Sequence, residues 1–402
     1  NSSEHGHTLV LTIDRSVQFA AERILADGVI ATNAQGGTLV AMRPSTGEIV
    51  ASATVSRNTD GSVEVSSENR AVTWAYEPGS IMKPLTFAGV VEEKVGAPSS
   101  VMEIPNSILI WEEAFIDSFA HETEEWSIAE ILKKSSNVGT IMWAQELGEK
   151  RLYERLSSFG LGQVTGLELP GETRGSLLGQ SKWSGTSLPT IAIGQGVAVT
   201  PMQMLVAYSA IANKGNRPVP SLVLGTRDNS GLFEIMNSES PERIFSTETS
   251  DLLIEMMEGV VTEGTGTAAQ VPGYRVAGKT GTAWKPLADG GYGDETGEQK
   301  YVASFAGFLP ADDPELSIIV VIDEPVAPYS GGKAAAPVFA EFAQFAVRQL
   351  RIPSEAERLG LEQPGRVIAT TPAQAREIAE AAAAAAALEE EATEEVAAPS
   401  VG

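Results

Sequence analysis

Ser80 and Lys83 lie three positions apart, beside signals for the start of a helix. Pro78-Gly79 predicts a turn, and Pro84 is tolerated only near the beginning of a helix. Because residues three apart share one helical face, the serine hydroxyl and the lysine amine can meet. The helix start also presents free backbone N–H groups where an oxyanion could form. The pair is a candidate for nucleophilic chemistry, and the alternative is a capping serine beside an exposed lysine.

A second Ser-x-x-Lys pattern runs from Ser330 to Lys333 in a different setting. It lies in a Gly-rich stretch, and we expect no helix to follow it. The backbone N–H groups that favour an oxyanion at a helix start are therefore not expected there. We predict that Ser80, rather than Ser330, is the reactive serine.

The segment Ser135-Ser136-Asn137 interrupts two helical stretches, 128–134 and 138–147. In a non-helical break alternate residues project to one side, so Ser135 and Asn137 could both point into a cleft. The alternative is a plain connection between two helices in which Asn137 is the N-cap.

Lys279-Thr280-Gly281-Thr282 occurs once and lies within a strand-like run. A glycine inside a strand commonly marks close approach by another backbone or by a ligand. A lysine beside two hydroxyl groups makes an anion-binding edge suited to a carboxylate. The alternative is an edge strand with a solvated lysine.

The elements that must position these residues are strands at both ends of the domain with a helical block between them. Asp14 and Thr200 are suitable N-caps for two of the helices. Such an order favours an α+β arrangement in which the terminal strands share one sheet. Apolar spacing predicts strands at 8–12, 37–42, 48–55, 274–284, 301–309 and 316–323, helices at 15–30 and 201–213, and mostly helix from 78 to 148.

Composition excludes several other functions. The 402 residues carry a formal net charge of −25, so a nucleic-acid partner is not expected. There is no cysteine, and three histidines are too few for a convincing metal site, so we expect no metal and no cofactor. A Ser-His-Asp triad would rest on His121 almost alone. No run approaches the roughly 20 apolar residues that span a bilayer, and the start at Asn1 suggests a mature form or a piece of a longer chain.

The C-terminal part differs from the rest in composition. It is rich in alanine and glutamate and includes seven consecutive alanines, Ala381 to Ala387. Such a tract favours helix but has no large apolar stripe to bury. We therefore predict a partly disordered tail without chemistry over residues 353–402. Composition alone does not decide whether residues 1–352 form one domain or two.

The three motifs occur in the order that defines class A β-lactamases and penicillin-binding proteins. Four further segments, 37–48, 194–203, 303–308 and 336–339, are similar to the transpeptidase domain of class B penicillin-binding proteins. The chain resembles that domain from about Thr8 to Leu350. The resemblance implies a five-stranded antiparallel sheet flanked by helices, with a helical subdomain and a cleft between them.

The resemblance also implies a reaction, the cross-linking of peptidoglycan stem peptides by a D,D-transpeptidase that β-lactams inhibit covalently. Ser80 would attack the penultimate D-Ala carbonyl, Lys83 would be its general base, and Ser135 would relay a proton to the leaving amine. The backbone N–H groups of Ser80 and Thr282 would form the oxyanion hole. The substrate-binding residues would be Asn137, Lys279, Thr280, Gly281 and Thr282.

The same resemblance also fits three other kinds of protein: a D,D-carboxypeptidase, a β-lactamase and a penicillin-sensing domain. A class A β-lactamase activates its hydrolytic water with a glutamate, but the segment 166–172, which holds Glu168 and Glu172, is more similar to penicillin-binding proteins. The family further implies an extracytoplasmic location, anchored to the membrane by an N-terminal segment absent from this chain. Its implied partners are a membrane glycosyltransferase and proteins of cell division or of elongation, which sets cell shape.

Overall fold

A computed structural model describes residues 7–167, 169–236, 240–286, 291–292 and 299–358. Residues up to Ser354 form one compact unit, and those from Glu355 form a second. Of the second unit, only the short helix α12 (Glu355–Arg358) is described. The predicted tail over 353–402 therefore lies almost entirely outside the described residues and stays a prediction.

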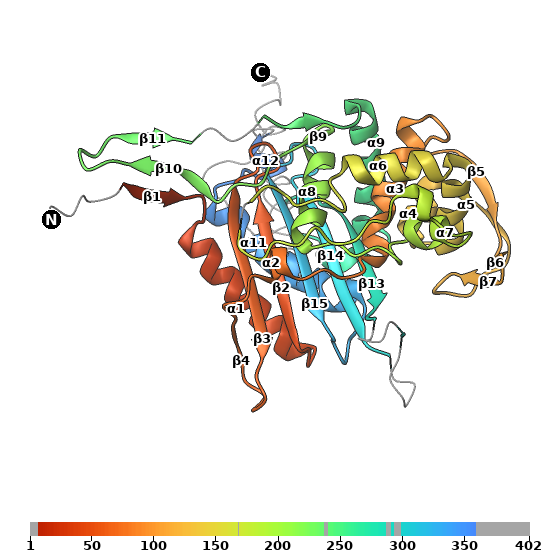
Figure 1. Cartoon of the computed structure of the whole chain (residues 1–402), viewed down its shortest axis with the longest axis horizontal. Helices are drawn as coiled ribbons and strands as arrows, with labels where there is room; N and C mark the ends of the chain where they lie inside the picture. Colours follow the sequence, from red (N-terminus) through yellow and green to blue (C-terminus); the bar gives the residue numbers. More distant parts are fainter. Residues whose placement is uncertain (1–6, 168, 237–239, 287–290, 293–298, 359–402) are drawn as a thin grey trace, which may run out of the picture. The chain divides into compact units, whose positions relative to one another are not determined.

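A six-stranded antiparallel sheet carries the fold of the first unit. The strands β2 and β3 from the start of the chain lie beside β13, β14 and β15 from its end, as predicted (Figure 1). The strand order is β13 (Ala277–Trp284), β14 (Tyr301–Leu309), β15 (Leu316–Asp323), β2 (Gly36–Met42), β3 (Ile49–Arg57) and β4 (Val63–Val65).

The sixth strand corrects the expected count of five. Val63 to Val65 pairs with the end of β3 at the sheet edge, and its three side chains are largely solvent-exposed. A strand of three residues is too short to produce a recognisable alternation, so its pairing partner rather than its sequence decides its structure. The α+β class itself is confirmed.

Both faces of the sheet are buried. Alternate side chains of β2 enter different cores, with Leu39 and Ala41 on one face and Val40 and Met42 on the other. The first face packs against α1 (Arg15–Ala31) and α11 (Ala336–Gln349), and the second against α8 (Pro201–Ala212). This double burial explains why β2 and β15 are continuous apolar runs rather than alternating ones.

The two predicted N-caps are confirmed. Asp14 accepts hydrogen bonds from the backbone N–H groups of Ser16 and Val17 at the start of α1. Thr200 forms a reciprocal capping box with Gln203 at the start of α8. Side-chain oxygens thus satisfy backbone donors that have no partner within either helix.

A helical subdomain packs against α8 and shares one apolar core with it. Its elements are the 3-10 turn η1 (Gly79–Met82), α3 (Lys83–Glu92), α4 (Ile128–Lys134), α5 (Asn137–Leu147), α6 (Glu149–Ser158), α7 (Ser187–Ala192) and α9 (Thr247–Thr262).

The expectation of mostly helix from 78 to 148 was wrong for residues 101–127. That segment contains a strand pair, β5 (Val101–Ile104) with β8 (Glu124–Ser127), and a hairpin of β6 (Ser107–Ile110) with β7 (Glu113–Ile116). Each strand has only four residues, and burial alternates along them only in part. Short β-branched runs bounded by polar residues are where helix and strand patterns are hardest to separate.

The remaining elements are small. β1 (Thr8–Leu11), confirmed as a strand, joins β10 (Val223–Arg227) and β11 (Phe233–Ile235), while β9 (Asn216–Arg217) pairs with β12 (Glu242–Arg243). Among the described residues, no helix has the length and apolarity needed to cross a membrane. The short helical segments are α2 (Arg70–Thr73), η2 (Gln180–Lys182), η3 (Thr267–Ala269) and α10 (Gly331–Ala334).

Candidate active site

Ser80 lies in η1, the turn that leads directly into α3. Two contacts from outside the helix fix this turn. The Gly79 N–H donates to the Gly194 carbonyl at 2.9 Å, and the Tyr208 hydroxyl donates to the Ile81 carbonyl at 2.9 Å. Gly79 has a positive φ of 57°, a conformation that glycine adopts without strain. The turn therefore presents a half-buried Ser80 side chain at the start of the helix, as the proline and glycine pattern predicted.

Lys83 is fully buried one turn along. Its Nζ donates to the Ser135 carbonyl at 2.6 Å and to Asn137 Oδ1 at 2.8 Å, and it lies 3.3 Å from Ser135 Oγ. Among the described residues, these hydrogen bonds tie Lys83 to the helix connection rather than to the Ser80 hydroxyl. The Lys83 amine is thus oriented toward Ser135 and Asn137 in the free protein.

Ser135 and Asn137 flank the connection between α4 and α5. Ser135 has a left-handed backbone with φ of 62°, which ends α4 and turns its side chain toward β13. Ser136, not Asn137, is the N-cap of α5, and its Oγ accepts from Gly139 N–H at 2.9 Å. Asn137 Nδ2 donates to the Ile116 carbonyl at 3.0 Å, so its Oδ1 faces Lys83. The alternative of Asn137 as N-cap is therefore wrong.

Lys279 reaches the same point from β13. It is fully buried, and its Nζ donates to Ser135 Oγ at 2.9 Å. Nζ also lies 3.2 Å from the Thr280 carbonyl and 3.3 Å from Thr280 Oγ1. The Ser135 hydroxyl consequently lies between the amines of Lys83 and Lys279, a geometry suited to moving a proton between groups.

Burial changes the acidity of both lysines. It lowers the pKa of Lys83 to about 7, while the Asp117 carboxylate acts in the opposite direction and raises it. Burial, followed by repulsion from Lys83, holds the pKa of Lys279 well below its usual value. A lysine that loses its proton near neutral pH can act as a general base.

A cleft of about 590 Å³ joins these elements. Thr280 and Thr282 of β13 line it, while Lys83 and Lys279 lie beneath its surface. A Cβ on Gly281 would stand 2.3 Å from Ser304 Oγ and 2.9 Å from the Pro78 carbonyl, so this glycine marks the close approach expected of it. Of the predicted site residues, those that line the cleft are Ser80, Ser135, Asn137, Thr280 and Thr282.

The second Ser-x-x-Lys also lies at this cleft, which corrects the expectation for it. The short helix α10 follows Ser330, and Ser330, Gly332 and Lys333 line the cleft beside the motif of β13. Gly331 N–H donates to Thr282 Oγ1 at 3.0 Å. Because the Thr282 oxygen accepts this bond, its hydroxyl proton is available to a ligand. A Cβ on Gly331 would lie 2.2 Å from the Gly281 carbonyl, which explains the glycine-rich sequence.

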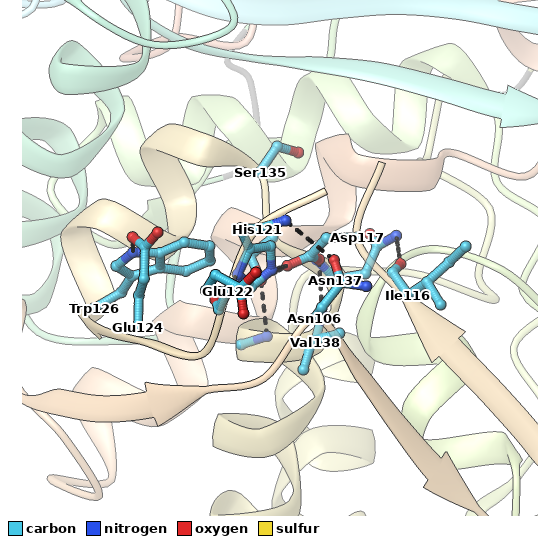
Figure 2. Close-up of polar contacts among 12 residues, drawn as sticks. Asn106, Ile116, Asp117, His121, Glu122, Glu124, Trp126, Ser135, Asn137 and Val138 are labelled. Carbon is cyan, nitrogen blue, oxygen red and sulfur yellow. Dashed lines mark hydrogen bonds and ion pairs between the residues drawn. The ribbon is translucent and has the colours of Figure 1, made fainter. Parts of the chain in front are cut away.

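Sequence reasoning missed one buried carboxylate behind the site. Asp117 follows β7, and its fully buried side chain contacts Ser136, Asn137 and Val138 (Figure 2). A single aspartate in a polar stretch carries no local signal of such a contact. Only the position of β7 against the start of α5 reveals it.

The family model described as penicillin binding protein transpeptidase domain matches residues 37–344. The penicillin-binding protein PbpB of Mycolicibacterium smegmatis is 36% identical, over 87% of this chain and 55% of that protein. The peptidoglycan D,D-transpeptidase FtsI of Escherichia coli K12 is 32% identical, over 89% of this chain and 59% of that protein. The chain thus spans little more than half the length of these relatives.

A solved structure of penicillin-binding protein 3 from Mycobacterium tuberculosis, in complex with ampicillin, has the same fold. Its TM-score is 0.80 at 32% identity, covering 91% of this chain and 83% of the solved chain. The family match, over residues 37–344, includes all three motif-bearing elements. The chain belongs to the penicillin-binding protein transpeptidase domain family, with class B proteins among its relatives.

Proposed function

We propose that this domain is a peptidoglycan D,D-transpeptidase that cross-links stem peptides through an acyl-enzyme on Ser80. The observation that carries the proposal is the convergence of two buried lysines on the Ser135 hydroxyl, beneath a cleft that Ser80 also lines. Serine-type acyl transfer needs a nucleophile, a neutral base, a proton path and an oxyanion site close together.

Acylation begins when the neutral Lys83 amine takes the proton of Ser80 Oγ, which attacks the penultimate D-Ala carbonyl. Hydrogen bonds of catalytic groups often tighten only with substrate bound, so Lys83 Nζ is expected to turn toward Ser80 at this stage. The backbone N–H groups of Ser80 and Thr282 stabilise the oxyanion. The C–N bond then breaks, and the terminal D-Ala leaves as its amine receives a proton through Ser135.

The second half-reaction reverses this proton path. An amine of a neighbouring stem peptide attacks the ester carbonyl and loses a proton, which Ser135 passes to Lys83. The ester C–O bond then breaks, and Lys83 returns the proton to Ser80 Oγ. Lys279 keeps the Ser135 hydroxyl in place through the hydrogen bond that its Nζ donates to Ser135 Oγ. The hydroxyls of Thr280 and Thr282 hold the terminal carboxylate, Gly281 lets the strand approach closely, and Asn137 holds the substrate amide.

The pH dependence of acylation tests the role of Lys83. Since the pKa of Lys83 is about 7 and only the neutral amine accepts a proton, the reactive fraction grows as pH rises through that value. We expect the second-order rate of acylation by a fluorescent penicillin to rise across the neutral range and then level off. A rate that is flat, or falls with rising pH in this range, would contradict a lysine base.

A β-lactamase is the nearest rival, and the position of Glu172 favours the transpeptidase. Its carboxylate accepts from Thr165 N–H at 2.6 Å and from Thr165 Oγ1 at 2.5 Å, so it stabilises its own loop. Glu172 is not part of the cleft lining, and Glu168 lies outside the described residues. We expect a long-lived penicillin adduct. Rapid hydrolytic turnover of the adduct would favour the lactamase.

A transpeptidation assay separates the transpeptidase from the carboxypeptidase and the sensor. The protein is incubated with a donor ending in D-Ala-D-Ala and with an added amine. We expect a cross-linked product from the wild type and none from Ser80→Ala. Hydrolysed donor without cross-linked product would favour a carboxypeptidase, and penicillin binding without either product would favour a sensor.

The proposed reaction also implies a cellular location and protein partners. Peptidoglycan stem peptides are cross-linked outside the cytoplasmic membrane, so we propose that this domain acts there, held at the membrane. Its partners would be a membrane glycosyltransferase, which supplies the glycan strands, and proteins of division or elongation. Detection of the native protein in a membrane fraction, labelled by a penicillin that cannot enter cells, tests this location.

A further inference from the structure

Asp117 is a buried acid directly behind the catalytic cleft. Its side chain is fully buried, and no lysine or arginine forms an ion pair with it among the described residues. The carboxylate instead accepts four hydrogen bonds. Figure 2 shows Asp117 among His121, Asn137 and Val138. The donors are Asn137 N–H at 2.5 Å, Ser136 Oγ at 2.7 Å, Val138 N–H at 3.1 Å and His121 Nε2 at 3.1 Å.

Three of these bonds hold the start of α5. The N–H groups of Asn137 and Val138 are the first of the helix, so they lack partners within it. Ser136, which caps the helix, donates its hydroxyl proton to Asp117 while its oxygen accepts from Gly139 N–H. One carboxylate thus fixes the residues on the C-terminal side of Ser135. It does so from a separate element, the segment after β7.

His121 supports Asp117 from the other side. Its Nδ1 lies 2.6 Å from the Glu122 carbonyl, and its Nε2 lies 3.1 Å from the Asp117 carboxylate. Both partners only accept hydrogen bonds, so each contact is a hydrogen bond when the ring nitrogen concerned carries the proton. The ring is tilted against those of Trp126 and Phe119, with centroid distances of 4.4 Å and 5.4 Å, and its side chain is 5% exposed.

We propose that Asp117, supported by His121, is a positioning residue that holds the Ser135–Asn137 segment against Lys83. The proposal rests on the transpeptidase function proposed above. Asp117 does not itself line the cleft, and it acts through Asn137, whose N–H donates to Asp117 and whose Oδ1 accepts from Lys83 Nζ at 2.8 Å. Without the carboxylate, the N–H groups at the start of α5 lose their acceptor, and the partners of the Lys83 amine are no longer fixed.

Asp117 also acts on Lys83 through its charge. The ionisable groups around Lys83 are Lys279 on β13, Asp117 after β7 and, behind Asp117, His121. Of these, Asp117 raises the pKa of Lys83 against the effect of burial. Removal of that negative charge lowers the pKa of Lys83 further. The pH at which acylation becomes fast should then move to lower values.

Two substitutions separate the contact from the charge. Asp117→Ala removes both, and we expect it to slow acylation by penicillin at least about tenfold. Asp117→Asn keeps the shape of the side chain and one acceptor oxygen, so acylation persists. Because the negative charge is gone, the rise in acylation rate with pH should occur about one pH unit lower. A role limited to folding would lower the unfolding temperature without moving the pH profile.

Glu92 provides a matched control. Its carboxylate accepts from Ser246 N–H at 3.1 Å, Ser246 Oγ at 2.7 Å and Thr249 Oγ1 at 2.6 Å at the start of α9, outside the cleft. Glu92→Gln should therefore lower the unfolding temperature as Asp117→Asn does, but leave the acylation pH profile unchanged. Equal shifts of the profile in both variants would overturn the proposal.

The pairing with His121 has a spectroscopic test. The chain has three histidines, so ¹⁵N-histidine labelling gives few ring signals, and a His121→Phe variant assigns the one concerned. We expect a proton on Nε2 of His121 in the wild type and a changed Nε2 signal in Asp117→Asn. An Nε2 without a proton in the wild type would remove His121 from the proposal.

The outcomes also distinguish this inference from the function on which it rests. A wild-type protein that penicillin does not label would reject the proposed function itself. In the other case the wild type is labelled normally, while Asp117→Ala and Asp117→Asn are acylated at the wild-type rate and with the wild-type pH profile. That result would reject only the role of Asp117.

Discussion

Replacement of Ser80 by alanine is expected to abolish covalent labelling by penicillin while leaving the fold intact. The substitution removes the one oxygen that the proposed acyl-enzyme requires. Within the described part of the chain, the Ser80 side chain forms no hydrogen bond, and the bonds that fix η1 come from Gly79 and Tyr208. Gel fluorescence after labelling measures the adduct, and thermal unfolding measures the fold.

Ser330→Ala is the informative comparison, because it removes the other serine of a Ser-x-x-Lys pattern at the same cleft. We expect this variant to remain labelled, with the adduct on the peptide that contains Ser80 when the digest is analysed by mass spectrometry. Labelling that persists in Ser80→Ala and disappears in Ser330→Ala would transfer the nucleophile to Ser330.

The positions of Ser80 and Lys279 could be predicted because their signals are local. Pro78 and Pro84 constrain the backbone on either side of Ser80, so the start of the helix follows from nearby residues. Lys279 lies in a run long enough to predict a strand, which β13 confirms from Ala277 onward. The pairing of strands from both ends of the chain also followed from their order. These signals were sufficient for the fold class and for the elements of the site.

Contacts between distant segments could not be predicted in the same way. Ser330 was not predicted to be at the site, because the two glycines after it indicated a loop. The absence of Cβ atoms at these glycines is what allows α10 to pack closely against β13. Asp117 was missed because its backbone partners lie 20 and 21 residues further along the chain, at the start of α5 and beyond both β8 and α4. The short strands β5 to β8, which deliver Asp117, were mistaken for helix. In each case the partner segment, rather than the local sequence, determines what the residue does.

Lys83→Ala is expected to slow acylation by roughly 10² to 10⁴-fold, the range associated with loss of a general base. The amine is buried, its pKa is about 7, and Lys83 begins α3 one turn after Ser80, which lies in the preceding turn η1. Stopped-flow measurement of penicillin acylation gives the rate directly. The substitution also removes two hydrogen bonds to the Ser135–Asn137 segment, so a slow variant could reflect either loss.

Lys83→Arg separates the two effects. A guanidinium can donate to the Ser135 carbonyl and to Asn137 Oδ1, but it stays protonated and cannot accept a proton from Ser80. If Lys83 is the base, the arginine variant should be about as slow as the alanine variant and should lose the rise in rate through neutral pH. If Lys83 only holds the Ser135–Asn137 segment, the arginine variant should recover most of the rate. An unchanged rate in both variants would reassign the base, and Lys279, which shares the Ser135 hydroxyl, would be the next residue to substitute.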